Sequence, residues 1–69
     1  MEKGFLYLLE SEKDNSLYLG STKDIHNRAS LHNQGKVLST KSKRPWRIKF
    51  LIRFDDLKKA RRIEQKIKS

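Results

Sequence analysis

The first apolar stretch of the chain, residues 5–9 (Phe-Leu-Tyr-Leu-Leu), is hydrophobic at every position. A strand covered on both faces has this pattern, whereas a half-exposed strand alternates. The polar stretch that follows contains residues 14–16 (Asp-Asn-Ser), which are typical of a turn. Residues 17–19 (Leu-Tyr-Leu) then predict the return strand of a hairpin that ends at Gly20. The pattern therefore predicts a central strand paired with a second strand.

Helix signals come next along the chain. Asn33 and Gly35 form a stop signal, and the candidate N-caps before them are Ser21, Thr22 and Asp24. We expect a helix of about three turns between these signals. Residues 34–44 are rich in Gly, Ser, Thr and Lys, and they are expected to form a loop.

The clearest pattern follows Pro45. Over residues 46–54 apolar and mostly basic side chains alternate, which predicts a strand with one apolar and one largely basic face. Asp55 and Asp56 then predict the cap of a final helix. The apolar positions of that helix, at helical spacing, are Leu57, Ala60, Ile63 and Ile67. The order strand, strand, helix, strand, helix indicates a small α+β domain.

Length and composition narrow the class of protein. The 69 residues suffice for one small domain, so we expect residues 1–69 to form a single domain. The longest apolar run is too short to cross a membrane, and the N-terminus lacks the pattern of a signal peptide. The chain has no cysteine, which excludes disulfides and thiolate metal sites. We expect a cytoplasmic protein without a membrane partner.

The charge is unevenly distributed along the chain. The net charge is +9, yet residues 1–35 carry −1 and residues 36–69 carry +10. A separated basic half is typical of proteins that bind a polyanion, most often nucleic acid. In residues 35–44 the hydroxyl groups and the four cations Lys36, Lys41, Lys43 and Arg44 suit contact with a phosphate backbone without sequence readout. A solvated basic loop is the alternative.

Glu64 is an unusual residue in the final helix. It lies on the predicted inward stripe, and every other charged side chain of that helix is Lys or Arg. An inward carboxylate needs a partner, which is either an arginine or a hard cation. Both a structural ion pair and a metal ligand fit this position.

Four further residues are candidates for chemistry. Arg28 and His32 are four positions apart and share one helix face, where they could hold a phosphate and move a proton or form a solvated surface. Tyr7 and Tyr18 lie on the two strands of the hairpin, and the turn does not settle whether they face the same side. Gly20 marks a strand end or a close approach of the backbone.

Taken in order, these residues resemble the GIY-YIG endonuclease superfamily. The chain is similar to its small stand-alone members, which look like the N-terminal nuclease domain of the bacterial excinuclease. The two half-motifs are residues 5–7 (Phe-Leu-Tyr) and 18–20 (Tyr-Leu-Gly). The further matches, in family order, are residues 20–24, Arg28, His32, Asn33, Gly35, Thr40, Pro45, Trp46 and Glu64. The resemblance covers essentially the whole chain.

The resemblance implies a three-stranded antiparallel sheet with flanking helices. It also implies DNA hydrolysis with one divalent metal, Mg²⁺ or Mn²⁺, at low sequence specificity, structure-directed or in repair or recombination. By position, Glu64 would bind the metal, Tyr7 or Tyr18 would activate water, Arg28 would hold the phosphate, His32 would assist proton transfer, and Lys23 would join the DNA contacts. A metal and an arginine together offset the negative charge that makes a phosphodiester resist attack. A tyrosine base, with a reference pKa of about 10, needs nearby cations to stabilise phenolate.

Two features depart from the family pattern. Phe5 stands where the first half-motif has glycine, and the chain ends five residues after Glu64, where relatives usually continue into a basic segment. A DNA-binding module on the same fold that no longer cleaves is therefore the alternative function, and a basic protein-interaction domain is a third. The sequence leaves the oligomeric state open.

Overall fold

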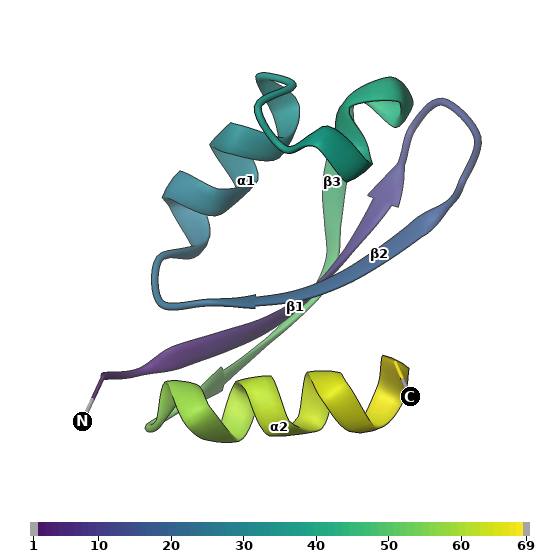
Figure 1. Ribbon diagram of the computed structural model, residues 1–69. Coiled ribbons are helices and arrows are strands. Elements are labelled where there is room, and N and C mark those ends of the chain that lie inside the picture. The colour runs from purple at the N-terminus through teal and green to yellow at the C-terminus, as the bar shows by residue number, and fades with distance from the viewer. Residues whose placement is uncertain (1, 69) are drawn as a thin grey trace.

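The computed structural model describes residues 2–68 and contains three strands, two α-helices and one 3₁₀-helix. In chain order these are β1 (Gly4–Ser11), β2 (Leu17–Thr22), α1 (Ile25–Asn33), η1 (Leu38–Lys43), β3 (Trp46–Phe54) and α2 (Leu57–Lys68). The strands form one antiparallel sheet in the order β2-β1-β3. Helix α1 and η1 lie over one face of the sheet, and α2 lies under the other (Figure 1). The predicted α+β class and element order are confirmed.

Strand β1 is the central strand, as its two-sided apolar pattern predicts. Leu6 on the α2 side and Leu9 on the α1 side are only 2% and 1% exposed. Pairing with β2 continues past Gly20 to the Phe5–Thr22 pair, so the predicted strand end at Gly20 is wrong. Gly20 instead lies inside the ladder, directly opposite Tyr7.

Strand β3 differs from its predicted pattern. Leu8 pairs with Phe50 and Leu9 with Ile48, so Lys49 between them is an extra residue, a β-bulge. A bulge shifts the alternation of side chains, and Ile48 therefore shares the face of Leu9 while Phe50 shares the opposite face with Leu8. The prediction of a single apolar face is thus wrong. Apolar side chains of this edge strand remain 42–45% exposed, namely Ile48, Phe50, Leu51 and Ile52.

The helices begin where the sequence indicates. The Asp24 carboxylate accepts a hydrogen bond from the Asn27 amide at 3.1 Å, which makes Asp24 the N-cap of α1. At the start of α2, Asp56 accepts one from the Lys58 amide at 3.0 Å. Leu57 and Ala60 are buried as predicted, whereas Ile67 is 62% exposed and is not a core residue.

Residues 38–43 form η1, where the sequence predicts an irregular loop. Two contacts hold this 3₁₀-helix on the sheet: the Trp46 indole donates to the Thr40 carbonyl at 2.9 Å, and the Ser11 hydroxyl donates to the Lys43 carbonyl at 2.7 Å. Trp46 is 6% exposed and belongs to the hydrophobic core. Within residues 2–68, no helix is both long and apolar enough to cross a bilayer.

Candidate active site

The register of β1 and β2 answers the question that the turn leaves open. Tyr7 lies opposite Gly20, and Leu9 lies opposite Tyr18, so both tyrosines project from the same face, towards α1. Their ring centroids are 6.4 Å apart. The two half-motifs therefore meet on one face of the sheet.

Gly20 is the place of close backbone approach. A Cβ atom at this position would lie 2.6 Å from Tyr7 Cζ and closer still to the hydroxyl oxygen of that ring. Because real Cβ atoms do not come so close, any side chain here would push the Tyr7 ring aside. The glycine thus lets the Tyr7 ring lie against the backbone of β2.

His32 connects α1 to Tyr7. The Tyr7 hydroxyl oxygen lies 3.1 Å from His32 Nε2, and His32 Nδ1 lies 2.8 Å from the Thr40 hydroxyl oxygen. The Tyr18 ring packs against the same imidazole, with centroids 5.0 Å apart. Burial, assisted by the charge of Arg28, lowers the pKa of His32, so the imidazole is neutral near pH 7.

The phenol of Tyr7 is neutral as well. Burial raises the pKa of Tyr7 far above its usual value; Tyr18 adds to this effect, Arg28 opposes it, and Glu64 adds a smaller rise. Tyr7 is only 2% exposed. The electrostatics show that Arg28 and Glu64 both act on this phenol, although they lie on different helices.

Glu64 reaches the sheet from α2, as its position on the inward stripe predicts. Its carboxylate accepts hydrogen bonds from the Ser21 hydroxyl and, at 2.8 Å, from the Lys68 ammonium, and its side chain is 14% exposed. Burial raises the pKa of Glu64, but the hydrogen bonds from Lys68 and Ser21 and the charges of Lys68 and Arg61 outweigh it and lower the pKa overall. Glu64 is therefore ionised at neutral pH.

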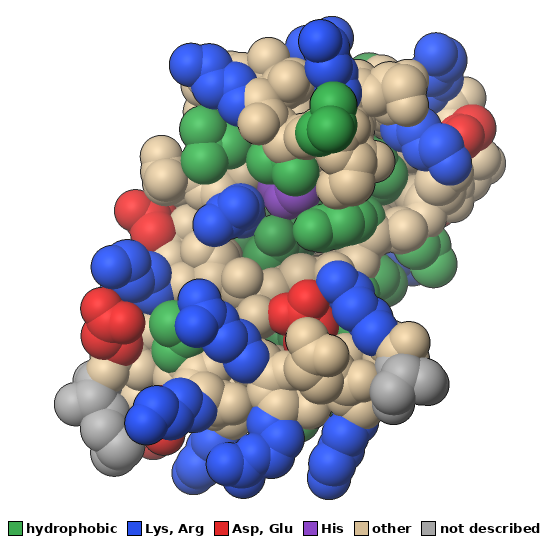
Figure 2. Space-filling model, viewed as in Figure 1, with side chains coloured by type: hydrophobic (Ala, Val, Ile, Leu, Met, Phe, Trp, Pro, Cys, Tyr) green, Lys and Arg blue, Asp and Glu red, His purple; other side chains and the backbone are tan. Residues whose placement is uncertain are grey.

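The Tyr7–His32 pair and Glu64 lie on opposite faces of the sheet, and the edge strand β2 contacts both of them. Tyr18 and Ser21 project from this edge strand to opposite faces of the sheet, towards His32 and Glu64 respectively. The Lys68 ammonium reaches around the edge and lies 5.2 Å from the Tyr18 ring centroid. On this side of the molecule basic side chains gather along α2 and around η1, and an acidic group lies between them (Figure 2).

The carboxylate of Glu64 fits one kind of metal. Residues 2–68 contain no cluster of three or more His, Cys, Asp or Glu that could enclose an ion. Mg²⁺ needs no such cage, because it keeps several waters and binds through one or two carboxylates and the phosphates of the substrate. In this structure the cation beside Glu64 is the Lys68 ammonium, 2.8 Å away.

The side chains predicted to contact DNA differ in whether they have partners within the protein. Lys36, which precedes η1, and Lys41, which lies within it, have exposed side chains. The other three hold partners within the protein: Lys23 with Glu2 at 3.5 Å, Lys43 with Asp14 at 3.7 Å and the Ser16 hydroxyl at 3.0 Å, and Arg44 with the Lys41 carbonyl at 2.9 Å.

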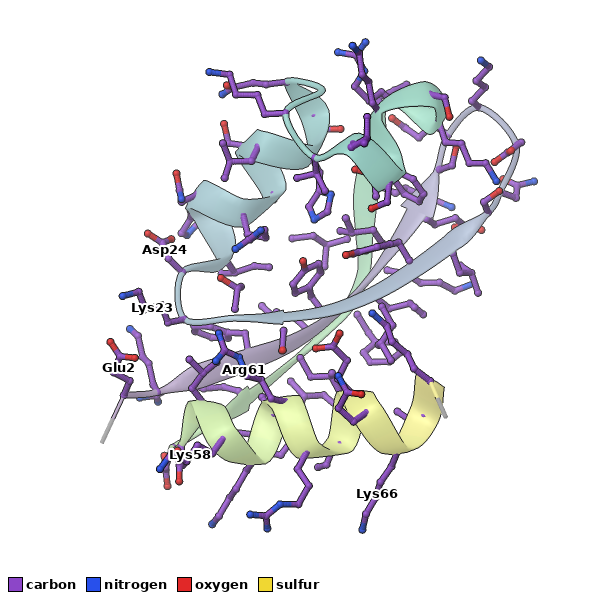
Figure 3. The ribbon with its side chains drawn as sticks, in the orientation of Figure 1. Glu2, Lys23, Asp24, Lys58, Arg61 and Lys66 are labelled. Carbon is purple, nitrogen blue, oxygen red and sulfur yellow. The ribbon has the colours of Figure 1, made fainter. Side chains whose placement is uncertain are left out.

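Sequence reasoning gave no site role to four neighbours of the site: Ser21, Thr40, Arg61 and Lys68. Arg61 and Lys68 are three residues before and four after Glu64, so helical spacing could have identified them. Figure 3 shows Arg61 rising from α2 towards the sheet, whereas Lys66 points away from it. Ser21 and Thr40 match the family pattern, but the sequence does not reveal their partners, because these contacts depend on how β2 and η1 are placed.

Comparison with known proteins agrees with this geometry. The sequence model of the GIY-YIG catalytic domain family matches residues 3–69. The UPF0213 protein SSP2268 of Staphylococcus saprophyticus is 37% identical over 100% of this chain and 84% of its own length. The UPF0213 protein YazA of Bacillus subtilis is 39% identical over 87% of this chain and 61% of its own length. The solution structure of the UPF0213 protein BH0048 of Bacillus halodurans superposes with a TM-score of 0.57 at 31% identity, covering 96% of this chain and 70% of that one. The two half-motifs on one face of the sheet and the match along the whole chain lead to one conclusion: this protein belongs to the GIY-YIG family.

Proposed function

We propose that this protein hydrolyses phosphodiester bonds in DNA with one divalent metal, Mg²⁺ or Mn²⁺, held at Glu64. The observations that support it are the hydrogen-bonded Tyr7–His32 pair on one face of the sheet, the ionised Glu64 that contacts β2 at Ser21, and the charge of Arg28, which acts on the Tyr7 phenol. GIY-YIG nucleases generally use divalent metals. The four groups supply the functions that hydrolysis of a phosphate diester needs.

Two of these groups handle negative charge. Arg28 is half-buried, and within residues 2–68 its guanidinium has neither a hydrogen bond nor an ion pair, so it is available to a phosphate. Glu64 would hold the metal, which supplies charge neutralisation to the scissile phosphate and its leaving oxygen. For the ion to bind, the Lys68 ammonium must move away from the carboxylate.

Tyr7 and His32 handle the proton. A standing phenolate is unfavourable because burial raises the pKa of Tyr7. The phenol instead takes a proton from the attacking water while passing its own proton to His32 Nε2, 3.1 Å away. The neutral imidazole can accept it, and the charge of Arg28 stabilises negative charge on the phenol during the transfer. Tyr18 then serves to hold the imidazole ring in place.

The DNA backbone would lie along the β2 edge, between α2 and η1. We assign phosphate contacts to Lys23, Lys36, Lys41, Lys43 and Arg44, and we add Arg61 from α2, which Figure 3 shows directed towards the sheet. Such contacts carry no sequence information, so cleavage is expected to have low sequence specificity.

Nicking of supercoiled plasmid tests the proposal. The wild-type protein should nick with Mg²⁺ or Mn²⁺ and not with EDTA. Glu64→Gln keeps the shape of the side chain and removes its charge, and it should lower the rate at least about a hundredfold. Glu12→Gln, the same change at an exposed turn residue, is the matched control and should nick normally.

The outcomes separate two functions. Nicking by Glu64→Gln at the wild-type rate would refute the proposed role of the carboxylate. DNA binding without any nicking would instead favour a binding module on this fold. The ion pair with Lys68 is the observation that favours this second candidate, because a carboxylate satisfied by Lys68 needs no metal.

A further inference from the structure

A chain of polar groups runs through the interior from β1 to the start of η1. Beyond the Tyr7–His32 and His32–Thr40 contacts, the Thr40 hydroxyl oxygen lies 3.3 Å from the Val37 carbonyl oxygen. Tyr7, His32 and Thr40 are 2%, 1% and 0% exposed. Because these side chains are so little exposed, their protons are shared within the chain of contacts in the protein without substrate.

The number of protons on these groups determines which group donates each hydrogen bond. A carbonyl oxygen only accepts, so the bond from Thr40 to Val37 uses the single hydroxyl proton of Thr40. The Thr40 oxygen then accepts, and His32 Nδ1 must carry a proton and donate it. A neutral imidazole with its proton on Nδ1 has a bare Nε2, which accepts the phenol proton of Tyr7. Every proton in the chain then has an acceptor.

The reverse arrangement leaves one proton without an acceptor. If Thr40 donated to Nδ1, His32 would carry its proton on Nε2 and donate it to the Tyr7 oxygen. Within residues 2–68, His32 Nε2 is the only hydrogen-bond partner of the Tyr7 hydroxyl, so the phenol proton would be buried and unpaired. A doubly protonated imidazole is also disfavoured, because burial and Arg28 lower the pKa of His32. The first arrangement is therefore the stable one.

We propose that Thr40 is a positioning residue whose hydroxyl holds His32 in the Nδ1–H tautomer, so that Nε2 faces Tyr7 as a proton acceptor. Thr40 is itself fixed by η1, since its amide donates to Val37 at 3.1 Å and its carbonyl accepts from the Trp46 indole at 2.9 Å. The consequence for catalysis rests on the proposed nuclease activity, whereas the tautomer of His32 does not.

Nitrogen NMR of the imidazole rings tests the tautomer directly. The ¹⁵N-labelled protein at neutral pH should show a protonated Nδ1 and an unprotonated Nε2 for His32, assigned by comparison with His26→Gln, which removes the other histidine. Thr40→Ser keeps the hydroxyl and should keep this pattern. Thr40→Val has the same shape without a donor or acceptor, and it should shift His32 towards the Nε2–H tautomer. Ser39→Ala, an exposed hydroxyl of the same 3₁₀-helix, is the matched control.

The nicking rate gives a second readout. Thr40→Val should lose at least about tenfold in turnover at unchanged DNA affinity, a part of the roughly 10²- to 10⁴-fold that acid–base catalysis contributes, and Thr40→Ser should restore it. A wild-type spectrum with the proton on Nε2 overturns the proposal, even if Thr40→Val does not fold. An unchanged tautomer in folded Thr40→Val also overturns it. The expected tautomers in a protein that nicks no DNA support the positioning role and refute the nuclease.

Discussion

At the scale of single residues, the contact between Gly20 and Tyr7 leaves no room for a side chain at position 20 of β2. The hydrogen atom of Gly20 leaves room for a ring whose Cζ would be 2.6 Å from any Cβ there. The same ring position places the hydroxyl oxygen 3.1 Å from His32 Nε2. The glycine of the second half-motif therefore serves the packing of the ring and also preserves its hydrogen bond to His32, which a displaced ring would lose.

Gly20→Ala should destabilise the protein by about 1–3 kcal/mol, the usual cost of inserting a methyl group into a filled site. Urea unfolding measures this change. Tyr7→Phe removes the closest atom, so the cost of Gly20→Ala should be smaller in that background, with an interaction energy of at least about 0.5 kcal/mol. Equal costs in both backgrounds would show that Gly20 does not act through the Tyr7 hydroxyl.

Residue types and spacing predict part of this site. Helical spacing places Glu64 on the inward face of α2 and Arg28 with His32 on one face of α1, and in the structure Glu64 contacts Ser21 of β2 and His32 contacts Tyr7 of β1. Ser21 and Thr40 could not be identified in this way. Their hydroxyls bind partners 43 and 8 residues away in sequence, across contacts that exist only once the sheet and η1 have formed.

At the scale of elements, β3 shows where periodicity fails. Alternation over residues 46–54 predicts the strand correctly, but one extra residue, Lys49, divides its apolar side chains between two faces. Local sequence carries no sign of the bulge, because it arises from pairing with β1. For residues 38–43 the prediction is wrong because it misses an element. Their polar composition predicts a loop, whereas the contact between the buried residues Thr40 and Trp46 holds a 3₁₀-helix there.

Helix α2 supports a matched test of DNA contact. Arg61 and Arg62 are neighbours about 100° apart around the helix, and the charge of Arg61 acts on Glu64. Arg61→Gln should weaken DNA binding about three- to tenfold and reduce the salt dependence by about one unit of slope, as expected for the loss of one phosphate contact. Arg62→Gln removes the same charge and should change neither quantity appreciably. Fluorescence anisotropy over a salt series measures both, and equal losses in the two variants would show a diffuse effect of net charge.

At the scale of the whole molecule, the two edges of the sheet differ in how their charged side chains are paired. Arg47 and Lys49 of β3 lie 2.6 and 3.9 Å from the Glu10 carboxylate, so acidic β1 partly neutralises the far edge of the sheet. On the opposite edge, Glu64 lies among cations of α2, and Arg28 has no acidic partner within residues 2–68. The strongest positive field is therefore expected at the β2 edge, beside the residues proposed for catalysis.

This distribution predicts how binding depends on salt. Without metal, the logarithm of the DNA association constant should fall linearly with the logarithm of salt concentration, at a slope of about −5.4 if each of the six assigned cations contacts one phosphate. Glu64→Gln should keep that slope and bind somewhat more tightly, because it removes one negative charge facing the phosphates. If Glu64→Gln keeps the wild-type salt slope in metal-free binding and does not nick DNA when metal is added, the binding surface is separate from the proposed catalytic carboxylate. A slope near zero would exclude phosphate contacts, and with them both the nuclease and the DNA-binding module, leaving protein interaction as the function of this basic surface.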